Sequence, residues 1–171
     1  MYMYVTTGTE DFMEQLQKRH ANKGLILMKD VNQCLLLHET EGKSIFQTPR
    51  RYEVIATAGE LKEEGYFVFH NIPVTDESKP VFEHRFSASD TQIESEQGFL
   101  AFRLLRPLGS DTYVIMTEWE AASDYDRWTH SQSFQQSIFS ADMNEFARDT
   151  THIFSSAAYI STYVAKIDDD E

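Results

Sequence analysis

The chain has 171 residues, of which 41% are hydrophobic and 13% aromatic, and its formal net charge is -13 at pH 7. This length allows one medium domain, or two small fused domains, with a substantial core. The strong negative charge argues against nucleic acids and anionic lipids as partners, because both require a basic surface.

The first third of the chain predicts a strand, a helix and a hairpin. Residues 1–8 alternate large and small side chains, which is typical of a strand. Thr9 can cap a helix over residues 9–20. Two short apolar runs, 24–30 and 33–40, are separated by two residues and indicate a β-hairpin.

The following segment is expected to end the first half of the chain with a helix. Residues 41–47 predict a turn with a short edge strand. Pro49 can begin a helix and Gly59 can end one, so we expect residues 50–60 to be helical. The order β-α-β-β-α would then complete residues 1–64.

The second half predicts the order β-α-β-β-α-β, which is that of a ferredoxin-like split βαβ unit. The expected elements are a strand at 65–75, a helix at 76–89, strands at 98–107 and 111–120, a helical segment at 123–146 with a break near Ser131, a strand at 157–167 and an acidic tail at 168–171.

The predicted fold class is α+β, with two ferredoxin-like (split βαβ) halves packed as a dimeric-α/β-barrel-like body within one chain. The halves are 1–64 and 65–167, and no linker rich in Pro, Gly or Ser separates them near Gly65. Such a unit leaves one sheet face bare unless a second sheet covers it. Because two units in one chain can cover each other, we expect a monomer.

Targeting signals and disulfides are not expected. Cys34 is the one cysteine and is interpreted as a small buried hydrophobe. The N-terminal residues lack the basic and apolar regions of a signal peptide. No apolar stretch approaches the roughly 20 residues of a membrane helix. A cytoplasmic protein without a membrane partner is therefore expected.

Common catalytic and metal-binding motifs are absent from the sequence. None of the 6 histidines is spaced from another His, Cys or carboxylate as zinc ligands are. There is no P-loop, GxGxxG, GxSxG or Cys-His arrangement. The sequence therefore predicts no dedicated metal site, and it lacks support for the usual hydrolases, kinases and dehydrogenases.

Asn71 is the first candidate site residue. Strand alternation places it on one face with Phe67 and Phe69, and His70 on the opposite face. A buried amide among aromatic rings must find partners or lose about 1–3 kcal/mol. Asn71 is thus either a ligand-binding group or a cap of the turn at Pro73.

Trp128 is the second candidate site residue. It shares a helical face with Tyr125. A tryptophan in this setting is either part of the core or the wall of a pocket, because a buried indole N–H needs an acceptor in both cases.

Several segments resemble the C-terminal domain of the Isd-type heme-degrading monooxygenases, which belong to the antibiotic-biosynthesis-monooxygenase superfamily. They are FHNIPVT, VFEHRF, GFLAFRLLRPLGSDTYVIMTEWE and DRWTHSQSF. The first half, including LLLHETEGKSIFQTPRRYEVIATAGE, resembles the added N-terminal domain of two-domain members. It equally resembles TRAP-type regulatory proteins, which share this layout. The resemblance covers nearly the whole chain.

The resemblance implies a heme-degrading monooxygenase that binds heme as both substrate and cofactor. It would open the porphyrin with O2 and electrons from an unidentified donor, and release iron. Asn71 and Trp128 match two of the family's three functional side chains. Asn71 would offer its amide N–H to a ligand on the iron, and Trp128 would distort the porphyrin. Ile138 stands at the position of the family's heme-ligand His and cannot ligate iron.

The axial ligand is therefore left open. His130 lies about 200° round the helix from Trp128, so it is not assigned. His84, on the earlier predicted helix, is not assigned either, and Tyr125 and Met143 are further possibilities without a ranking. Arg103 or Arg106 could pair with a heme propionate, or else form a surface pair with the many acidic side chains.

Two other functions compete with heme degradation. The alternative is a non-enzymatic, TRAP-like signal or stress regulatory protein that keeps the fold, and Ile138 favours it. A further possibility is a cofactor-free monooxygenase in which Asn71 and Trp128 bind another planar aromatic substrate.

Overall fold

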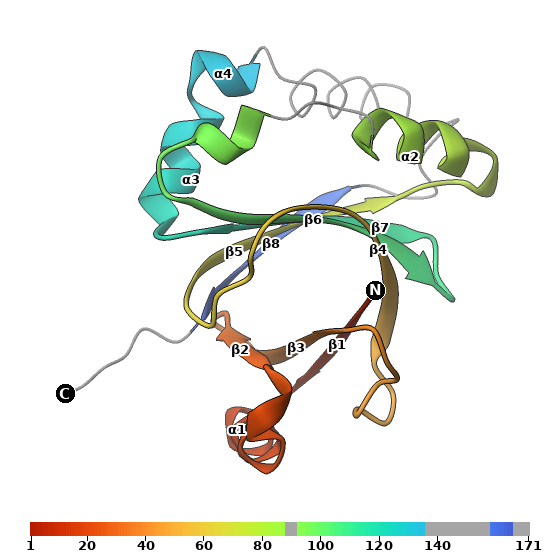
Figure 1. Cartoon of the computed structure of the whole chain (residues 1–171), viewed down its shortest axis with the longest axis vertical. Coiled ribbons are helices and arrows are strands. Elements are labelled where there is room, and N and C mark those ends of the chain that lie inside the picture. Colours follow the sequence, from red (N-terminus) through yellow and green to blue (C-terminus); the bar gives the residue numbers. More distant parts are fainter. Residues whose placement is uncertain (88–91, 136–157, 166–171) are drawn as a thin grey trace.

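The structure is a computed structural model of the chain and describes residues 1–87, 92–135 and 158–165. Within these ranges the fold is α+β, as predicted: antiparallel strands close into a barrel and helices lie outside it (Figure 1). The strands are β1 (Tyr2–Gly8), β2 (Ile26–Lys29), β3 (Cys34–Thr40), β4 (Arg50–Gly59), β5 (Gly65–Pro73), β6 (Phe99–Leu108), β7 (Thr112–Trp119) and β8 (Tyr159–Ala165). Around the barrel they follow the order β1-β3-β2-β8-β5-β7-β6-β4.

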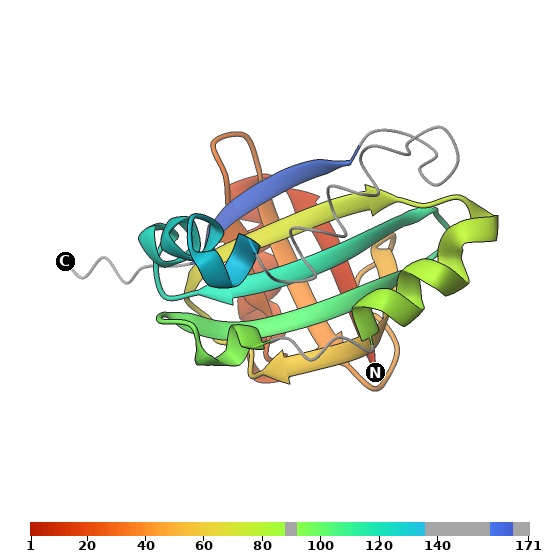
Figure 2. The same cartoon turned by 90° about the horizontal axis from the view of Figure 1, so that it is seen from above.

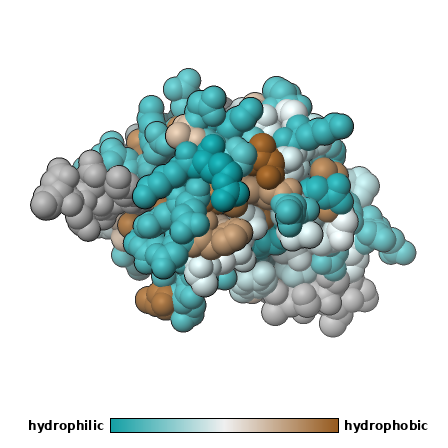
Figure 3. Space-filling model, turned by 90° about the horizontal axis from the view of Figure 1, so that it is seen from below, coloured by the Kyte–Doolittle hydropathy of each residue, from teal (hydrophilic) through white to brown (hydrophobic). Residues whose placement is uncertain are grey.

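The described helices lie on two sides of the barrel (Figures 1 and 2). They are α1 (Glu10–Arg19), α2 (Lys79–Ser87), α3 (Ala122–Thr129) and α4 (Gln132–Gln135), with short 3-10 turns at Ala21–Lys23, Asp76–Ser78 and Gln92–Ser95. α2, α3 and α4 lie over the strands of the second half, and α1 lies on the opposite side of the barrel (Figure 1). The side that carries α1 is mostly hydrophilic, with a few isolated hydrophobic residues (Figure 3).

Helix α1 begins as the sequence predicts. The Thr9 side chain accepts a hydrogen bond from the Phe12 N–H at 3.4 Å, which satisfies one of the free donors of the first turn. Acidic residues occupy the first turn and basic residues the last, in agreement with the helix dipole. Met13 is the buried residue of this helix and packs against the outer face of β1 and β3.

The helix expected at residues 50–60 is wrong, because this segment is strand β4. It pairs with β1 on one side and with β6 on the other, and so closes the barrel. Gly59 has φ +69, and a Cβ on it would lie 2.1 Å from the Leu100 carbonyl oxygen. The glycine that resembled a helix end is therefore required where β4 passes close to β6.

The other predicted helices and strands of the described ranges are confirmed within a few residues, except that the short edge strand expected at 41–47 does not form and these residues belong to an irregular loop. The break near Ser131 separates α3 from α4. The Ser131 hydroxyl donates to the Trp128 carbonyl oxygen at 2.6 Å and accepts from the Phe134 N–H at 3.0 Å, so it ends one helix and caps the next. The remainder of the helical segment predicted to reach residue 146, and the acidic tail at 168–171, lie outside the described residues.

Alternation along the strands divides the apolar side chains into an inner and two outer clusters. The inner cluster fills the barrel and includes Phe67, Phe69 and Met116. One outer cluster lies under α2 and α3, and the other lies under α1. The sheet therefore has packed residues on both faces, which explains the long apolar runs in its strands.

The two predicted halves share one barrel through two seams. β4 pairs with β6 along almost its whole length, from Arg51 to Gly59. Between β2 and β8 the described pairs are those of Met28 and Lys29. The division into domains at 1–64 and 65–167 stays a prediction, since the strands of both segments belong to one sheet.

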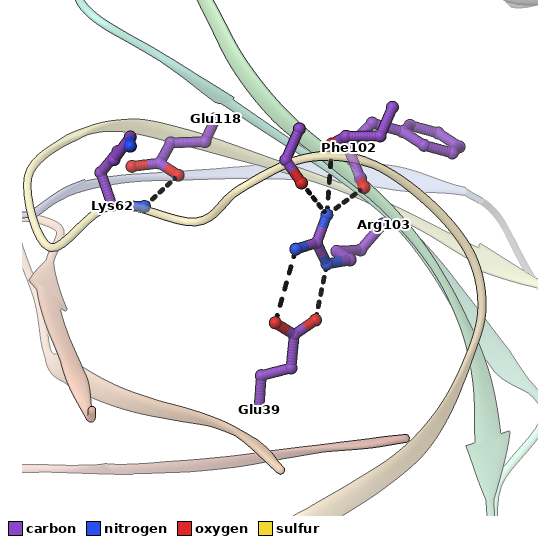
Figure 4. Close-up of polar contacts among 7 residues, drawn as sticks. Glu39, Lys62, Phe102, Arg103 and Glu118 are labelled. Carbon is purple, nitrogen blue, oxygen red and sulfur yellow. Dashed lines mark hydrogen bonds and ion pairs between the residues drawn. The ribbon is translucent and has the colours of Figure 1, made fainter. Parts of the chain in front are cut away.

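A buried ion pair crosses the barrel interior between the two halves (Figure 4). Arg103 of β6 contacts Glu39 of β3, with 2.5 Å between Nε and Oε2. Its Nη1 also donates to the carbonyl oxygens of Ala58, Gly59 and Phe102 at 2.8–3.2 Å. The guanidinium thus has a partner for its charge and acceptors for its remaining donors, which burial of a charge requires.

None of the helices in the described ranges combines the length and apolar character that crossing a bilayer requires.

Glu39→Gln should destabilise the protein, because the guanidinium of Arg103 would stay charged inside the barrel without its counterion. Removing one partner of a buried pair costs about 3–5 kcal/mol, so we expect the free energy of unfolding in urea to fall by about 3 kcal/mol. Glu41→Gln is the matched control on an exposed side chain and should change stability by less than about 1 kcal/mol. Equal losses in the two variants would show that the buried pair contributes nothing specific.

Candidate functional site

Asn71 lies inside the barrel, on the inner face of β5. Its side chain is buried, at 2% exposure. The amide Nδ2 donates to the Phe69 carbonyl oxygen at 3.2 Å, the Tyr159 carbonyl oxygen at 3.4 Å and the Ser161 hydroxyl at 3.1 Å. The two N–H groups are therefore already occupied by β5 and β8, and the amide acts in the structure as a link between these strands.

Trp128 lies on the other side of the sheet, on α3. It is 4% exposed, and its ring is 5.2 Å from that of Trp119 and 4.7 Å from that of Phe134. The ring of Tyr125 belongs to the same group and is 6.1 Å from that of Trp128. These distances are typical of packed aromatic pairs, so Trp128 is a core residue of the outer cluster.

The structure does not bring Asn71 and Trp128 together. Val68 and Ile72 of β5 belong to the same outer cluster as Trp128, whereas Phe67 belongs to the inner cluster. The predicted alternation along β5 is confirmed, and it places the amide and the indole on opposite faces of the strand. As parts of one heme site, the two side chains would have to line the same cavity, and the structure contradicts this expectation.

His70 is a candidate that the functional interpretation of the sequence missed. It lies on the outer face of β5, where its Nε2 is 3.3 Å from the Tyr125 hydroxyl. Its Nδ1 is buried and has no hydrogen-bond partner. Burial lowers the pKa of the imidazole to about 4, so the ring is neutral at pH 7. The alternation that places Asn71 inside the barrel also places His70 outside it. This pattern is visible in the sequence and could have identified His70 as a candidate.

A pocket of about 1020 Å³ opens beside this aromatic group. Its lining residues are Lys62, Glu63, Glu64, Gly65, Tyr66, Leu100, Glu120, Ala121, Ala122 and Val164. The Tyr66 ring is 6.2 Å from that of Tyr125 and so connects the pocket with the outer cluster. Three glutamates on the lining oppose the binding of a carboxylate ligand through like-charge repulsion.

The described residues do not fit the predicted heme site. The amide faces the barrel interior, the indole is packed among aromatic rings, and the neighbouring pocket carries three glutamates. The position of the family's ligand His, Ile138, lies outside the described residues, as does Met143. The roles of Asn71, Trp128 and Ile138 toward heme therefore stay predictions. Among the residues that the structure describes, no cluster of His, Cys, Asp or Glu could hold a metal ion.

The two arginines considered for a heme propionate are both paired with protein carboxylates. Arg103 is buried in the barrel with Glu39. Arg106 bonds Glu83 of α2 at 2.7 Å and Glu53 of β4 at 2.8 Å. The expected surface pair with the protein's own acids is found for Arg106, whereas the pair of Arg103 is buried.

Glu118 is a buried carboxyl group that lacks a full set of partners (Figure 4). It is 0% exposed on the inner face of β7. Its Oε1 accepts the Lys62 backbone N–H at 3.0 Å, and its Oε2 has no hydrogen-bond partner. Burial raises the pKa of the carboxyl from 4.5 to about 8, so it holds a proton at pH 7.

Comparisons with known proteins show similarity to one family model and to two groups of relatives. Residues 65–138 match the family model described as Antibiotic biosynthesis monooxygenase. The chain is 26% identical over 170 residues to the Signal transduction protein TRAP of Staphylococcus epidermidis, covering 99% of each chain. It is also 26% identical over 129 residues to a Heme-degrading monooxygenase of Listeria monocytogenes, covering 75% of this chain and 77% of the relative.

A solved structure shows the same fold. It is described as that of a major regulator of staphylococcal pathogenesis, with a TM-score of 0.83, 24% identity, and coverage of 98% of this chain and 100% of the other. At this identity the likeness bears on the fold alone.

Glu118→Gln should remove a pH-dependent loss of stability. The pKa of this carboxyl is higher in the folded chain, about 8, than the ordinary value of 4.5. The folded state therefore binds the proton more tightly than the unfolded state, and this group lowers stability as pH rises from 4.5 to 8. The amide of Gln keeps an acceptor for Lys62 and carries no charge.

Urea unfolding of both proteins across this range provides the measurement. The variant should lose less stability than the wild type on going from pH 5 to pH 8.5, by on the order of 2 kcal/mol. Other carboxyl groups titrate alike in both proteins and cancel in the difference. Parallel stability curves would mean that Glu118 titrates normally.

Proposed function

Because residues 65–138 match the Antibiotic biosynthesis monooxygenase family model, we propose that the chain belongs to this superfamily and is a TRAP-like signal or stress regulatory protein that keeps this fold without heme chemistry. The proposal assigns the chain to the non-enzymatic alternative of the sequence analysis. In the part of the chain that the structure describes, this function would rest on a closed barrel with a helical layer, and no set of candidate catalytic groups converges there.

The observation that carries the proposal is the separation of Asn71 from Trp128. An amide that stabilises charge on a reacting ligand must face that ligand with free N–H groups. In this chain the amide of Asn71 bonds Phe69, Tyr159 and Ser161 on the inner face of the sheet. Trp128 packs on the outer face. The two groups cannot act on one substrate without a change in the strand itself.

The comparisons support the same function. The similarity to the signal transduction protein extends over 99% of both chains. The similarity to the heme-degrading monooxygenase covers 75% of this chain. Identity is the same in the two comparisons, so the difference lies in how much of the chain each relative accounts for.

Heme degradation is the second candidate, and one observation favours it. The neutral imidazole of His70 has an unpartnered Nδ1 on the outer face of β5, the face on which Trp128 lies. Neutral imidazole is a common ligand of heme iron. As an enzyme the protein would take heme as substrate and need an electron donor.

A hemin titration distinguishes the two candidates. For the regulatory protein we expect no saturable shift of the Soret band at one heme per chain beyond that given by an unrelated acidic protein. After reductant and O2 are added, the Soret band should then decay at the same rate as in that control. A one-to-one shift followed by enzyme-dependent loss of the band would overturn the proposal in favour of the monooxygenase.

Complementation of a deletion strain tests the regulatory function directly. The transcript profile of the strain should change on deletion and return with the wild-type gene. It should return equally with Asn71→Ser and Trp128→Phe, since a function based on the fold does not need an amide or an indole. Circular dichroism and thermal unfolding of the purified variants serve as the control for folding. Failure of either folded variant to complement would indicate chemistry at that side chain.

A further inference from the structure

A second pocket lies on the first half of the chain, far in the sequence from the family match. Its volume is about 590 Å³, within the range of small-molecule sites. It is formed by β1, the loop between β3 and β4, and the start of β4. The lining residues are Tyr4, Lys43, Ser44, Phe46, Gln47, Thr48, Pro49 and Arg51.

The pocket concentrates positive charge on a chain whose net charge is -13. Lys43 and Arg51 are both exposed, and neither takes part in an ion pair within the described part of the chain. The carboxylates at the end of β3 do not neutralise them, because Glu39 pairs with Arg103 and Glu41 with the N-terminal ammonium group. Two cations thus face the same pocket without a protein counterion.

The remaining wall is aromatic. The rings of Tyr4 and Phe46 line the pocket, and the His38 ring lies at 6.4 Å and 6.3 Å from them. His38 is 4% exposed, and its Nδ1 is buried without a hydrogen-bond partner. His38 therefore supports the two lining rings from behind, and a flat ring can pack against such a wall.

Hydrogen bonds within the loop hold this shape before any ligand arrives. The Tyr4 hydroxyl donates to the Gly42 carbonyl oxygen at 3.0 Å. The Ser44 hydroxyl accepts from the Phe46 N–H at 2.9 Å and donates to the Phe46 carbonyl oxygen at 3.2 Å. A loop fixed in this way loses little conformational entropy when a ligand binds.

We propose that this pocket binds a small organic phosphate that carries a flat ring. Lys43 and Arg51 would hold the phosphate, and Tyr4 and Phe46 would hold the ring. Gln47 and Thr48 add an amide and a hydroxyl donor to the same lining. This number of donors suits the three terminal oxygens of a phosphate better than the two of a carboxylate. The site is independent of the regulatory function proposed above.

Phenyl phosphate is the probe, measured by isothermal titration calorimetry with the full chain at low salt. We expect one site per chain, with tighter binding than phenol, inorganic phosphate or benzoate. Raising the ionic strength to about 0.5 M should weaken it, because exposed charges are screened. Absence of saturable binding at millimolar phenyl phosphate would overturn the proposal, as would benzoate binding equally well.

The double variant Lys43→Gln, Arg51→Gln tests the charges. It should raise the Kd for phenyl phosphate about tenfold or more, which corresponds to about 1.4 kcal/mol. The matched control is Lys18→Gln, Arg19→Gln, which removes the same charge from the surface of α1 and should change the Kd less than about twofold. Equal effects would mean that net charge alone attracts the probe. All four side chains are exposed, so both variants should fold.

Phe46→Leu tests the ring. It should weaken binding of phenyl phosphate and leave that of inorganic phosphate unchanged, because only the former has a ring to pack. Thermal unfolding shows whether the loop stays folded. If it does not, Lys43→Gln alone still tests the site, since this exposed side chain supports no contact of the core. A folded Phe46→Leu variant that binds both probes as the wild type does would contradict the assignment of the ring.

Discussion

The ion pair between Arg103 and Glu39 is the constraint on which the rest of the structure depends. It joins β6 to β3 across the interior of a closed barrel, so it fixes the two halves of the chain against each other. A charged pair is stable there only if its donors and acceptors form hydrogen bonds. The carbonyl oxygens of β4 and β6 accept the guanidinium N–H groups that the carboxylate does not bind. The barrel interior is thereby a packed core with a polar centre. Both described pockets lie outside it.

The sheet acts as a partition between two environments. Successive residues of β5 point alternately to the two sides of the sheet. One side is the barrel interior, with aromatic and sulfur-containing side chains, and the other is the outer layer under α3. Asn71 and His70 differ in chemistry and stand next to each other in sequence, yet the strand sends them to opposite faces. Neighbours in the sequence of this strand therefore lie on opposite faces, and residues of one site on it must share a face.

Local patterns in the sequence predict much of this fold. The cap at Thr9, the break at Ser131 and the alternation along β5 depend on neighbouring residues, so they are visible in the sequence. The segment of β4 was interpreted wrongly because Pro49 and Gly59 resemble the ends of a helix. Its pairing with β1 and β6 is a long-range property that outweighs these local signals. The partner of Arg103, 64 residues away, and the orphan oxygen of Glu118 are likewise set by closure of the barrel.

The long seam between β4 and β6 has a mechanical consequence. From Arg51 to Gly59, β4 is bonded to β6. The two halves of the chain therefore cannot separate along this line without breaking a row of backbone hydrogen bonds.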